Sequence, residues 1–184
     1  MRNTRYTYGS VTKFFHWTIA AIVITMLILG LVMTSTHNSP LKFQLYFIHK
    51  SLGLSVLILI IARILWRFLK EPPRYPDSVP RWEQKAAHFV QYVFYALMLI
   101  MPLSGWIMST AARHIPSFWG WVKIPFPGIA ANRSLAHLND QIHVCCAYIL
   151  TAIIIIHVLA ALKHHLLAKN NILTRMLPFS PNDK

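Results

Sequence analysis

Long stretches without formal charge constrain this chain more than any other feature. Residues 14–34, 86–112 and 141–162 contain no Asp, Glu, Lys or Arg. About 20 apolar residues in a helix are enough to cross the roughly 30 Å hydrocarbon core of a bilayer. Each stretch therefore predicts one transmembrane helix.

A fourth stretch, residues 45–69, is apolar at its centre but has basic residues near its ends. Lys50 lies near one end, and Arg63 and Arg67 lie near the other. Long basic side chains at helix ends can extend to the membrane interface, so they do not exclude a span. We therefore expect a single domain over residues 1–184, an all-α integral membrane four-helix bundle with helices at approximately 13–34, 45–69, 86–111 and 140–167.

Composition excludes several other classes of protein. Hydrophobic residues make up 55% of the 184 residues and charged residues only 12%, about half the usual charged share of a soluble domain. So apolar a chain is neither a water-soluble enzyme nor disordered. Its two cysteines, Cys145 and Cys146, are adjacent in sequence, which excludes a disulfide-stapled scaffold.

The basic excess predicts the orientation of the helices. There are 18 Lys and Arg against 5 Asp and Glu. With the N-terminus inside, only five basic residues fall in outer segments, and the other thirteen fall inside. Because basic loops stay in the cytoplasm, we expect a multi-pass membrane protein with both termini cytoplasmic, surrounded by lipid and not bound to nucleic acid. The five outer residues are Lys42, Lys50, Arg113, Lys123 and Arg133.

Two histidines on the last predicted helix are the strongest chemical signal. His143 and His157 are 14 residues apart, which is about 21 Å along a helix and nearly the same face. They are too far apart to bind one metal ion together. Each can bind a separate large cofactor, one near each membrane surface.

Depth in the membrane selects a partner for each of these histidines. His49 lies at the outer end of its helix, as His143 does, and His16 lies at the inner end, as His157 does. Imidazole is a common axial ligand of haem iron. We therefore expect two haem b groups between the helices, one bound by His49 and His143 and the other by His16 and His157. There are two alternatives. Each histidine could only hydrogen-bond a neighbouring carbonyl, or the protein could be a colourless transporter that uses histidines as proton or metal sites.

Further residues fit subsidiary roles around these cofactors. Gly53 follows His49 by one helical turn and would let a flat macrocycle lie against the helix. Basic side chains near the membrane surfaces would meet the haem propionates: Arg63 and Arg67 inside, Lys50 outside. Two inner histidines, His88 and His164, are candidates for a quinone or propionate site, with packing or head-group contact as the alternative, and His165 adjoins the second of them.

Several short motifs follow one another along nearly the whole chain. They are Phe15-His16-Trp17, Ile48-His49-Lys50-Ser51-Leu52-Gly53, Ala62-Arg63-Ile64-Leu65-Trp66-Arg67, Ala87-His88-Phe89 and Pro102-Leu103-Ser104-Gly105. In this order and spacing they resemble the bacterial cytochrome b561 family of four-helix, di-haem inner-membrane proteins, which implies a location in the bacterial inner membrane. The resemblance implies that His16, His49, His143 and His157 are the haem ligands.

The resemblance implies electron transfer to the quinone pool but leaves the donor open. Some members look like superoxide oxidases, which take electrons from superoxide at the periplasmic face and reduce ubiquinone. Others resemble haem b subunits that serve a partner dehydrogenase or hydrogenase. We expect the first activity, an oxidoreductase of the superoxide:quinone type, with the anchor subunit as the alternative.

Overall fold

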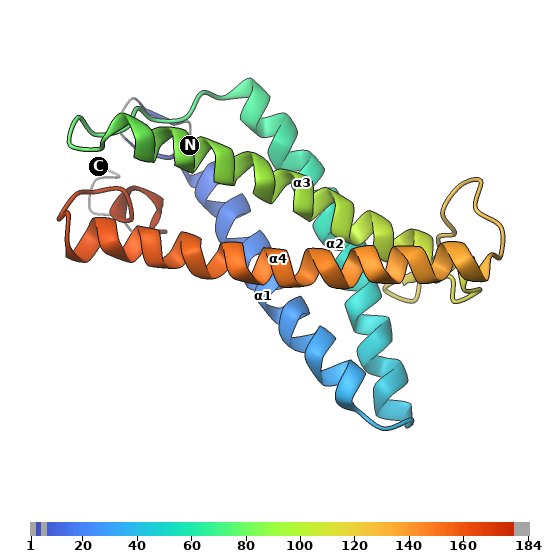
Figure 1. The fold of residues 1–184 in the computed structure, drawn as a ribbon. Coiled ribbons are helices and arrows are strands. Elements are labelled where there is room, and N and C mark those ends of the chain that lie inside the picture. Colours follow the sequence, from blue (N-terminus) through green and yellow to red (C-terminus); the bar gives the residue numbers. More distant parts are fainter. Residues whose placement is uncertain (1–2, 5–6, 179–184) are drawn as a thin grey trace.

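Four long helices make up almost all of the protein (Figure 1). The computed structural model describes residues 3–4 and 7–178. Each of the four helices is long and apolar enough to cross a membrane, which confirms the predicted all-α membrane fold. At 1.5 Å per residue they measure from about 39 to about 51 Å. They are α1 (Ser10–Ser35), α2 (Pro40–Leu69), α3 (Arg81–Ala111) and α4 (Arg133–Leu166).

Capping side chains determine where two helices begin. The Ser39 hydroxyl accepts a hydrogen bond from the Lys42 amide, and Pro40 occupies the first turn of α2. The Asn132 side chain accepts one from the Leu135 amide at 2.9 Å and starts α4 at Arg133. These helices therefore begin five and seven residues before the positions expected from hydropathy, 45 and 140, because their first turns are polar and project beyond the apolar core.

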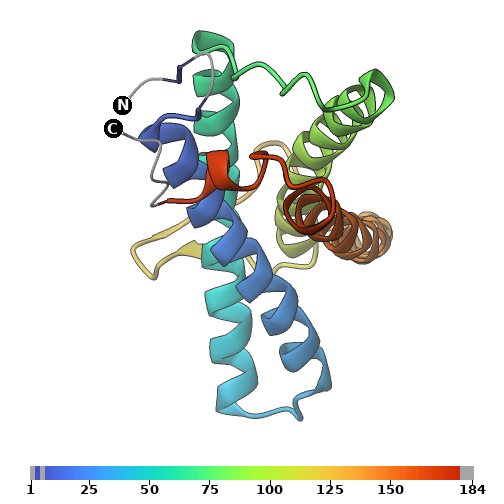
Figure 2. The same cartoon turned by 90° about the vertical axis from the view of Figure 1, so that its left-hand side faces the viewer.

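The helices form two antiparallel hairpins that cross each other (Figures 1 and 2). Helices α1 and α2 form one hairpin and α3 and α4 the other, and the main contact between the hairpins joins α2 to α3. Helices α1 and α4 pack less closely than these pairs. A space therefore remains between the hairpins, and it is lined by side chains from all four helices.

Apolar side chains lie both in the core and on the sides of the bundle. Ile19, Ile60 and Leu150 are buried where the helices meet, whereas Leu31 and Phe68 are exposed. Exposed large apolar residues on long spanning helices are lipid-facing. The sides of the bundle thus contact membrane lipid.

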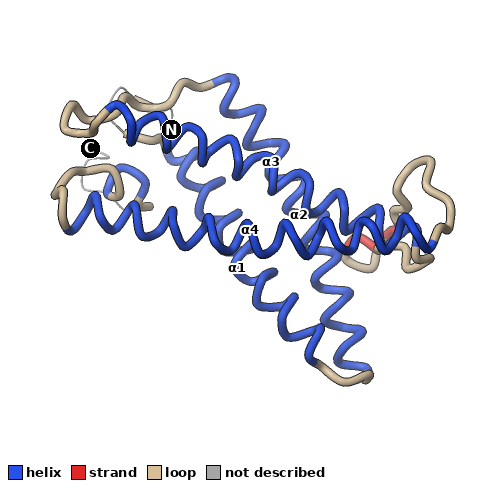
Figure 3. Tube along the Cα trace, viewed as in Figure 1, coloured by secondary structure: helices blue, strands red, loops and turns tan. Residues whose placement is uncertain are grey.

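Two opposite ends of the bundle differ in their connections (Figure 3). The end that the basic residues predict to face outward is called the outer end, and the opposite end the inner end. The outer end has the turn between α1 and α2 and the long α3–α4 loop, which contains a small hairpin of β1 (Ser117–Phe118) and β2 (Val122–Lys123). The inner end has the α2–α3 connector and the segment after α4, which includes the short 3-10 helix η1 (Thr174–Met176). Both ends of the described chain lie at this inner end (Figure 1).

Candidate functional site

Two pairs of histidines meet across the space between the hairpins. The ring centroids of His49 on α2 and His143 on α4 are 6.1 Å apart, and those of His16 on α1 and His157 on α4 are 6.2 Å apart. Two imidazoles on opposite sides of one metal have centroids about 6.3 Å apart, from two metal–nitrogen bonds of about 2 Å plus the two ring radii. Both separations match the distance expected for two imidazoles on opposite sides of one metal.

A backbone carbonyl orients the His143 ring. Its Nδ1–H donates to the Met101 carbonyl oxygen at 2.8 Å. With the proton on Nδ1, the lone pair of Nε2 is free to bind a metal, the arrangement commonly found for metal-bound histidine. Pro102 follows Met101 inside α3, and Ser104 also donates to this carbonyl at 2.8 Å.

A glycine allows the His143 ring to occupy this position. A Cβ atom at Gly105 would lie 3.0 Å from His143 Cε1 and 3.1 Å from its Nδ1, closer than ordinary van der Waals contact. Gly53, the glycine expected beside a macrocycle, is buried, and a Cβ there would meet only Met26 Cε at 3.5 Å. The tight steric requirement is therefore at Gly105.

The His49 ring is buried and both of its nitrogens lack a hydrogen-bond partner. The side chain is 8% exposed. A buried polar atom without a partner costs roughly 1–3 kcal/mol, so such atoms are uncommon unless a ligand satisfies them. A metal facing His143 would satisfy one of these nitrogens.

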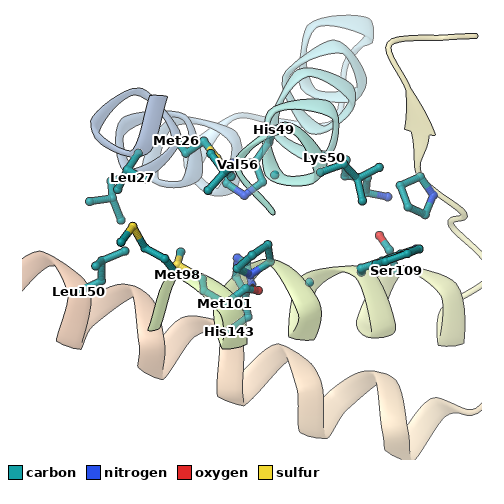
Figure 4. A pocket seen from close by; sticks show the side chains of 17 residues that line it. Met26, Leu27, His49, Lys50, Val56, Met98, Met101, Ser109, His143 and Leu150 are labelled. Atoms are coloured by element: carbon teal, nitrogen blue, oxygen red, sulfur yellow. The ribbon is translucent and has the colours of Figure 1, made fainter. Parts of the chain in front are cut away.

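A cavity opens between His49 and His143. In Figure 4 the two imidazoles project into it from opposite sides, with Met26, Met98 and Leu150 at one end. Lys50 and Ser109 lie toward the other end (Figure 4). The lining is mainly apolar, as a porphyrin requires.

The donor set fits a metal that brings its own other ligands. Within residues 3–4 and 7–178, no group of three or more His, Cys, Asp or Glu side chains could hold a metal ion. Haem iron needs only two protein ligands, because the porphyrin occupies the other four positions. The paired imidazoles, the free Nε2 and the apolar cavity all fit haem.

The inner pair lies in a more open and more basic setting. His16 is half-buried and His157 is exposed. The Phe94 ring packs on His157 with centroids 5.5 Å apart, and Arg63 Nη1 lies 3.5 Å from His16 Nδ1. That last distance is at the limit of a hydrogen bond and does not fix the tautomer of His16.

The other expected site residues lie at the two ends of the bundle. Lys50 lines the outer cavity and donates to the His114 carbonyl oxygen at 3.0 Å. Arg67 is half-buried one turn beyond Arg63. These positions suit anionic groups at either membrane surface, and their role toward propionates stays a prediction.

The remaining inner histidines lie apart from both pairs. His88 is exposed and packs edge-on against Tyr75 with centroids 5.5 Å apart. Both residues line an open, partly polar cavity at the inner end. His164 lies 3.4 Å from the Glu83 carboxylate, which also pairs with Lys163, and His165 is exposed.

Three features of the site were missed from sequence. The Met101 carbonyl belongs to the backbone and leaves no signal in the sequence. The close approach of Gly105 to His143 depends on how α3 packs against α4. Arg175 is buried at the inner end, and its burial was not predicted from sequence.

Known proteins resemble the chain over nearly its full length. The family model for prokaryotic cytochrome b561 matches residues 7–179. Cytochrome b561 homolog 2 of Escherichia coli K12 is 31% identical over 98% of this chain and 96% of its own length, and homolog 1 is 28% identical over 93% and 97%. A protein of Yersinia pestis named Probable superoxide oxidase CybB is 31% identical over 89% of this chain and 91% of its own length.

Fold, paired histidines and sequence similarity define a multi-pass membrane cytochrome of b type. The chain belongs to the prokaryotic cytochrome b561 family. It is accordingly a bacterial membrane protein that binds haem b and transfers electrons, as predicted from the order and spacing of its motifs.

Proposed function

We propose that the two histidine pairs bind two haem b groups and that the protein oxidises superoxide outside while reducing ubiquinone inside. The observation that supports two cofactors is the pair of centroid separations, 6.1 and 6.2 Å. When bound, haem b supplies reversible one-electron transfer. The overall reaction converts two superoxide ions, one quinone and two protons to two oxygen molecules and one quinol.

The residues of the chain have separate tasks at the outer pair. His49 and His143 would hold the iron, and the Met101 carbonyl keeps Nε2 of His143 available. The α3–α4 loop covers this site: Ser51 Oγ donates to the Ser117 carbonyl oxygen, and Trp119 Nε1 donates to Ser55 Oγ, both at 3.1 Å. This cover limits water around the outer site.

Basic groups at the outer end support an anionic donor. Lys50 lines the cavity beside His49, and Arg113, Lys123 and Arg133 are exposed. A local excess of cations raises the encounter rate of a small anion such as superoxide. The Yersinia pestis relative is named as a superoxide oxidase, which agrees with this assignment.

The inner cavity beside His88 is the quinone site that we propose. His88 and Tyr75 provide ring contacts, while Arg74, Arg81 and Gln84 supply hydrogen-bond donors to quinone oxygens. His88 is six residues from Phe94 on α3, about 9 Å along the axis, and the Phe94 ring contacts His157. The cavity therefore lies near the inner pair. With both termini cytoplasmic, quinol would form on the cytoplasmic side.

Superoxide turnover by the purified protein tests this function. Superoxide is generated at a fixed rate, and oxygen release and quinol formation are followed with a short-chain ubiquinone. We expect two superoxide ions consumed per quinol, and we expect His88→Ala to slow quinone reduction. A haem-loaded protein that does not react with superoxide would contradict the assignment. It would favour the alternative that the protein is the anchor subunit of a partner dehydrogenase or hydrogenase.

A further inference from the structure

A buried cation at the inner end has no anionic partner in the described chain. Arg175, on η1, is only 8% exposed. Its Nη1 donates to the Arg74 carbonyl oxygen at 2.6 Å, while its Nε is buried with no hydrogen-bond partner. In residues 3–4 and 7–178 the ion pairs are those of Glu83 with Lys163 and His164. A buried charge is costly unless it is paired, so an anion is expected here.

The segment that contains Arg175 crosses from α4 to α1 beside the inner histidine pair. Trp17 Nε1 donates to the Met176 carbonyl oxygen at 2.8 Å. The Trp17 ring also packs on the His16 ring, with centroids 5.3 Å apart. Figure 2 shows the segment, in red, passing from the end of α4 toward the first turns of α1. It bridges α1 and α4 at the inner end of the bundle, and these two helices pack less closely than the other neighbouring pairs.

Two further polar groups share this region with Arg175. Burial raises the pKa of the Tyr8 phenol and Tyr75 adds to the rise, while the nearby positive charges of Arg67 and Arg175 oppose it. Arg67 is one turn beyond Arg63, which lies 3.5 Å from the His16 ring. Arg63 therefore lies beside the inner histidine pair, and Arg67 lies one turn further along α2. Arg67 and Arg175 both lie close enough to Tyr8 to oppose the rise in its pKa.

We propose that Arg175, with Arg67 and the Tyr8 hydroxyl, binds a propionate carboxylate of the haem held by His16 and His157. This inference rests on the proposed two-haem function. A carboxylate suits the free donors because guanidinium groups bind carboxylates with strong, charge-assisted hydrogen bonds. The segment after α4 is then part of the cofactor site.

Redox titration of the inner haem is the first test. In the His143→Ala background, which leaves the inner pair intact, Arg175→Gln removes one positive charge. A nearby positive charge favours the reduced haem, so we expect the reduction equilibrium constant to fall about tenfold, which is 59 mV for a one-electron couple. Arg175→Lys should restore most of the potential. Lys85→Gln removes an exposed charge at the same end and should leave it unchanged.

Infrared spectroscopy tests the carboxylate directly. Haem labelled with ¹³C in its carboxyl groups marks the propionate bands in redox difference spectra. We expect Arg175→Gln to shift a labelled band and Lys85→Gln to leave it in place. A variant that binds the inner haem with unchanged potential and unchanged labelled bands would overturn the inference and leave Arg175 as a clamp on the α2–α3 connector.

Two further outcomes separate this inference from competing explanations. Phospholipid that co-purifies with the wild type and is lost from Arg175→Gln, with no change in the labelled bands, would show that the anion is a lipid phosphate and overturn the inference. A wild-type protein that binds no haem at the inner pair would overturn the proposed function itself. A wild type that binds haem at the inner pair, together with an Arg175→Gln variant whose potential and labelled bands are unchanged, would overturn only the inference.

Discussion

The outer and inner histidine pairs have nearly the same separation but different surroundings. The outer pair faces an apolar cavity, has one ring fixed by the Met101 carbonyl and lies under the α3–α4 loop. The inner pair has an exposed member, His157, and basic neighbours. The comparison shows how one helix, α4, contributes one histidine to each of two sites with different electrostatics. The outer site depends on steric and backbone positioning, and the inner site depends on charge.

Removing one ligand from α4 should have the largest effect. We expect His143→Ala to lose the outer haem and keep the inner one, and His157→Ala to do the reverse, because the two sites are about 21 Å apart along one helix. Haem per chain, measured by pyridine haemochrome, should fall from two to one in each variant. Equal loss of both haems in either variant would show that the sites are not independent.

A methyl group at Gly105 should damage only the outer site. The added Cβ would lie 3.0 Å from the His143 ring, and overpacking of this kind typically costs about 1–3 kcal/mol. Gly105→Ala should therefore weaken outer haem binding and lower the thermal stability of the loaded protein. Gly30→Ala is the matched control, because its Cβ would meet His49 Cε1 at an ordinary 3.9 Å. Equal effects of the two substitutions would contradict the steric argument.

Neutralising outer cations should slow the reaction without removing haem. In a variant combining Lys42→Gln, Lys50→Gln and Arg113→Gln, weaker electrostatic attraction should reduce the rate with superoxide and flatten its dependence on ionic strength. Stopped-flow measurements from low to high salt report both changes. The triple variant Lys70→Gln, Lys85→Gln and Lys169→Gln at the inner end provides a charge-matched comparison. A salt profile that keeps the wild-type slope would exclude steering by these three residues.

Breaking the ion pair at the inner end should have the smallest effect. Glu83 pairs with Lys163, whose side chain is 49% exposed, and lies 3.4 Å from His164. Such pairs typically contribute about 0–1 kcal/mol. Glu83→Gln should lower the melting temperature slightly and leave both haem spectra unchanged. Loss of the inner haem from this variant would mean that the pair positions α4 for ligand binding.

The sequence determined the fold because its signals are long and regular. Uncharged stretches of helical length predict the spans, and a fixed rise per residue relates His143 to His157 in depth. The same arithmetic predicts which histidines lie near each other, and the structure brings those residues together, while their ligand role stays a prediction. Polar first turns of α2 and α4 were not predicted, since hydropathy does not detect helix that projects beyond the membrane.

The parts of the site that sequence could not predict depend on backbone atoms and on contacts between distant segments. A backbone carbonyl has the same chemistry at every residue, so the role of the Met101 carbonyl depends on where α3 meets α4. Gly53 and Gly105 look equivalent in sequence, and only packing shows which one has an imidazole against it. Arg175 lies 101 residues from its partner Arg74, a contact that no local pattern indicates.

The most direct test of the account is the dithionite-reduced minus oxidised spectrum of the purified protein, with haem quantified per chain. The two imidazole pairs predict two low-spin, six-coordinate b-type haems in each chain. One haem per chain would contradict one of the two pairs. A colourless protein would contradict both and return the intramembrane histidines to a role in proton or metal transport.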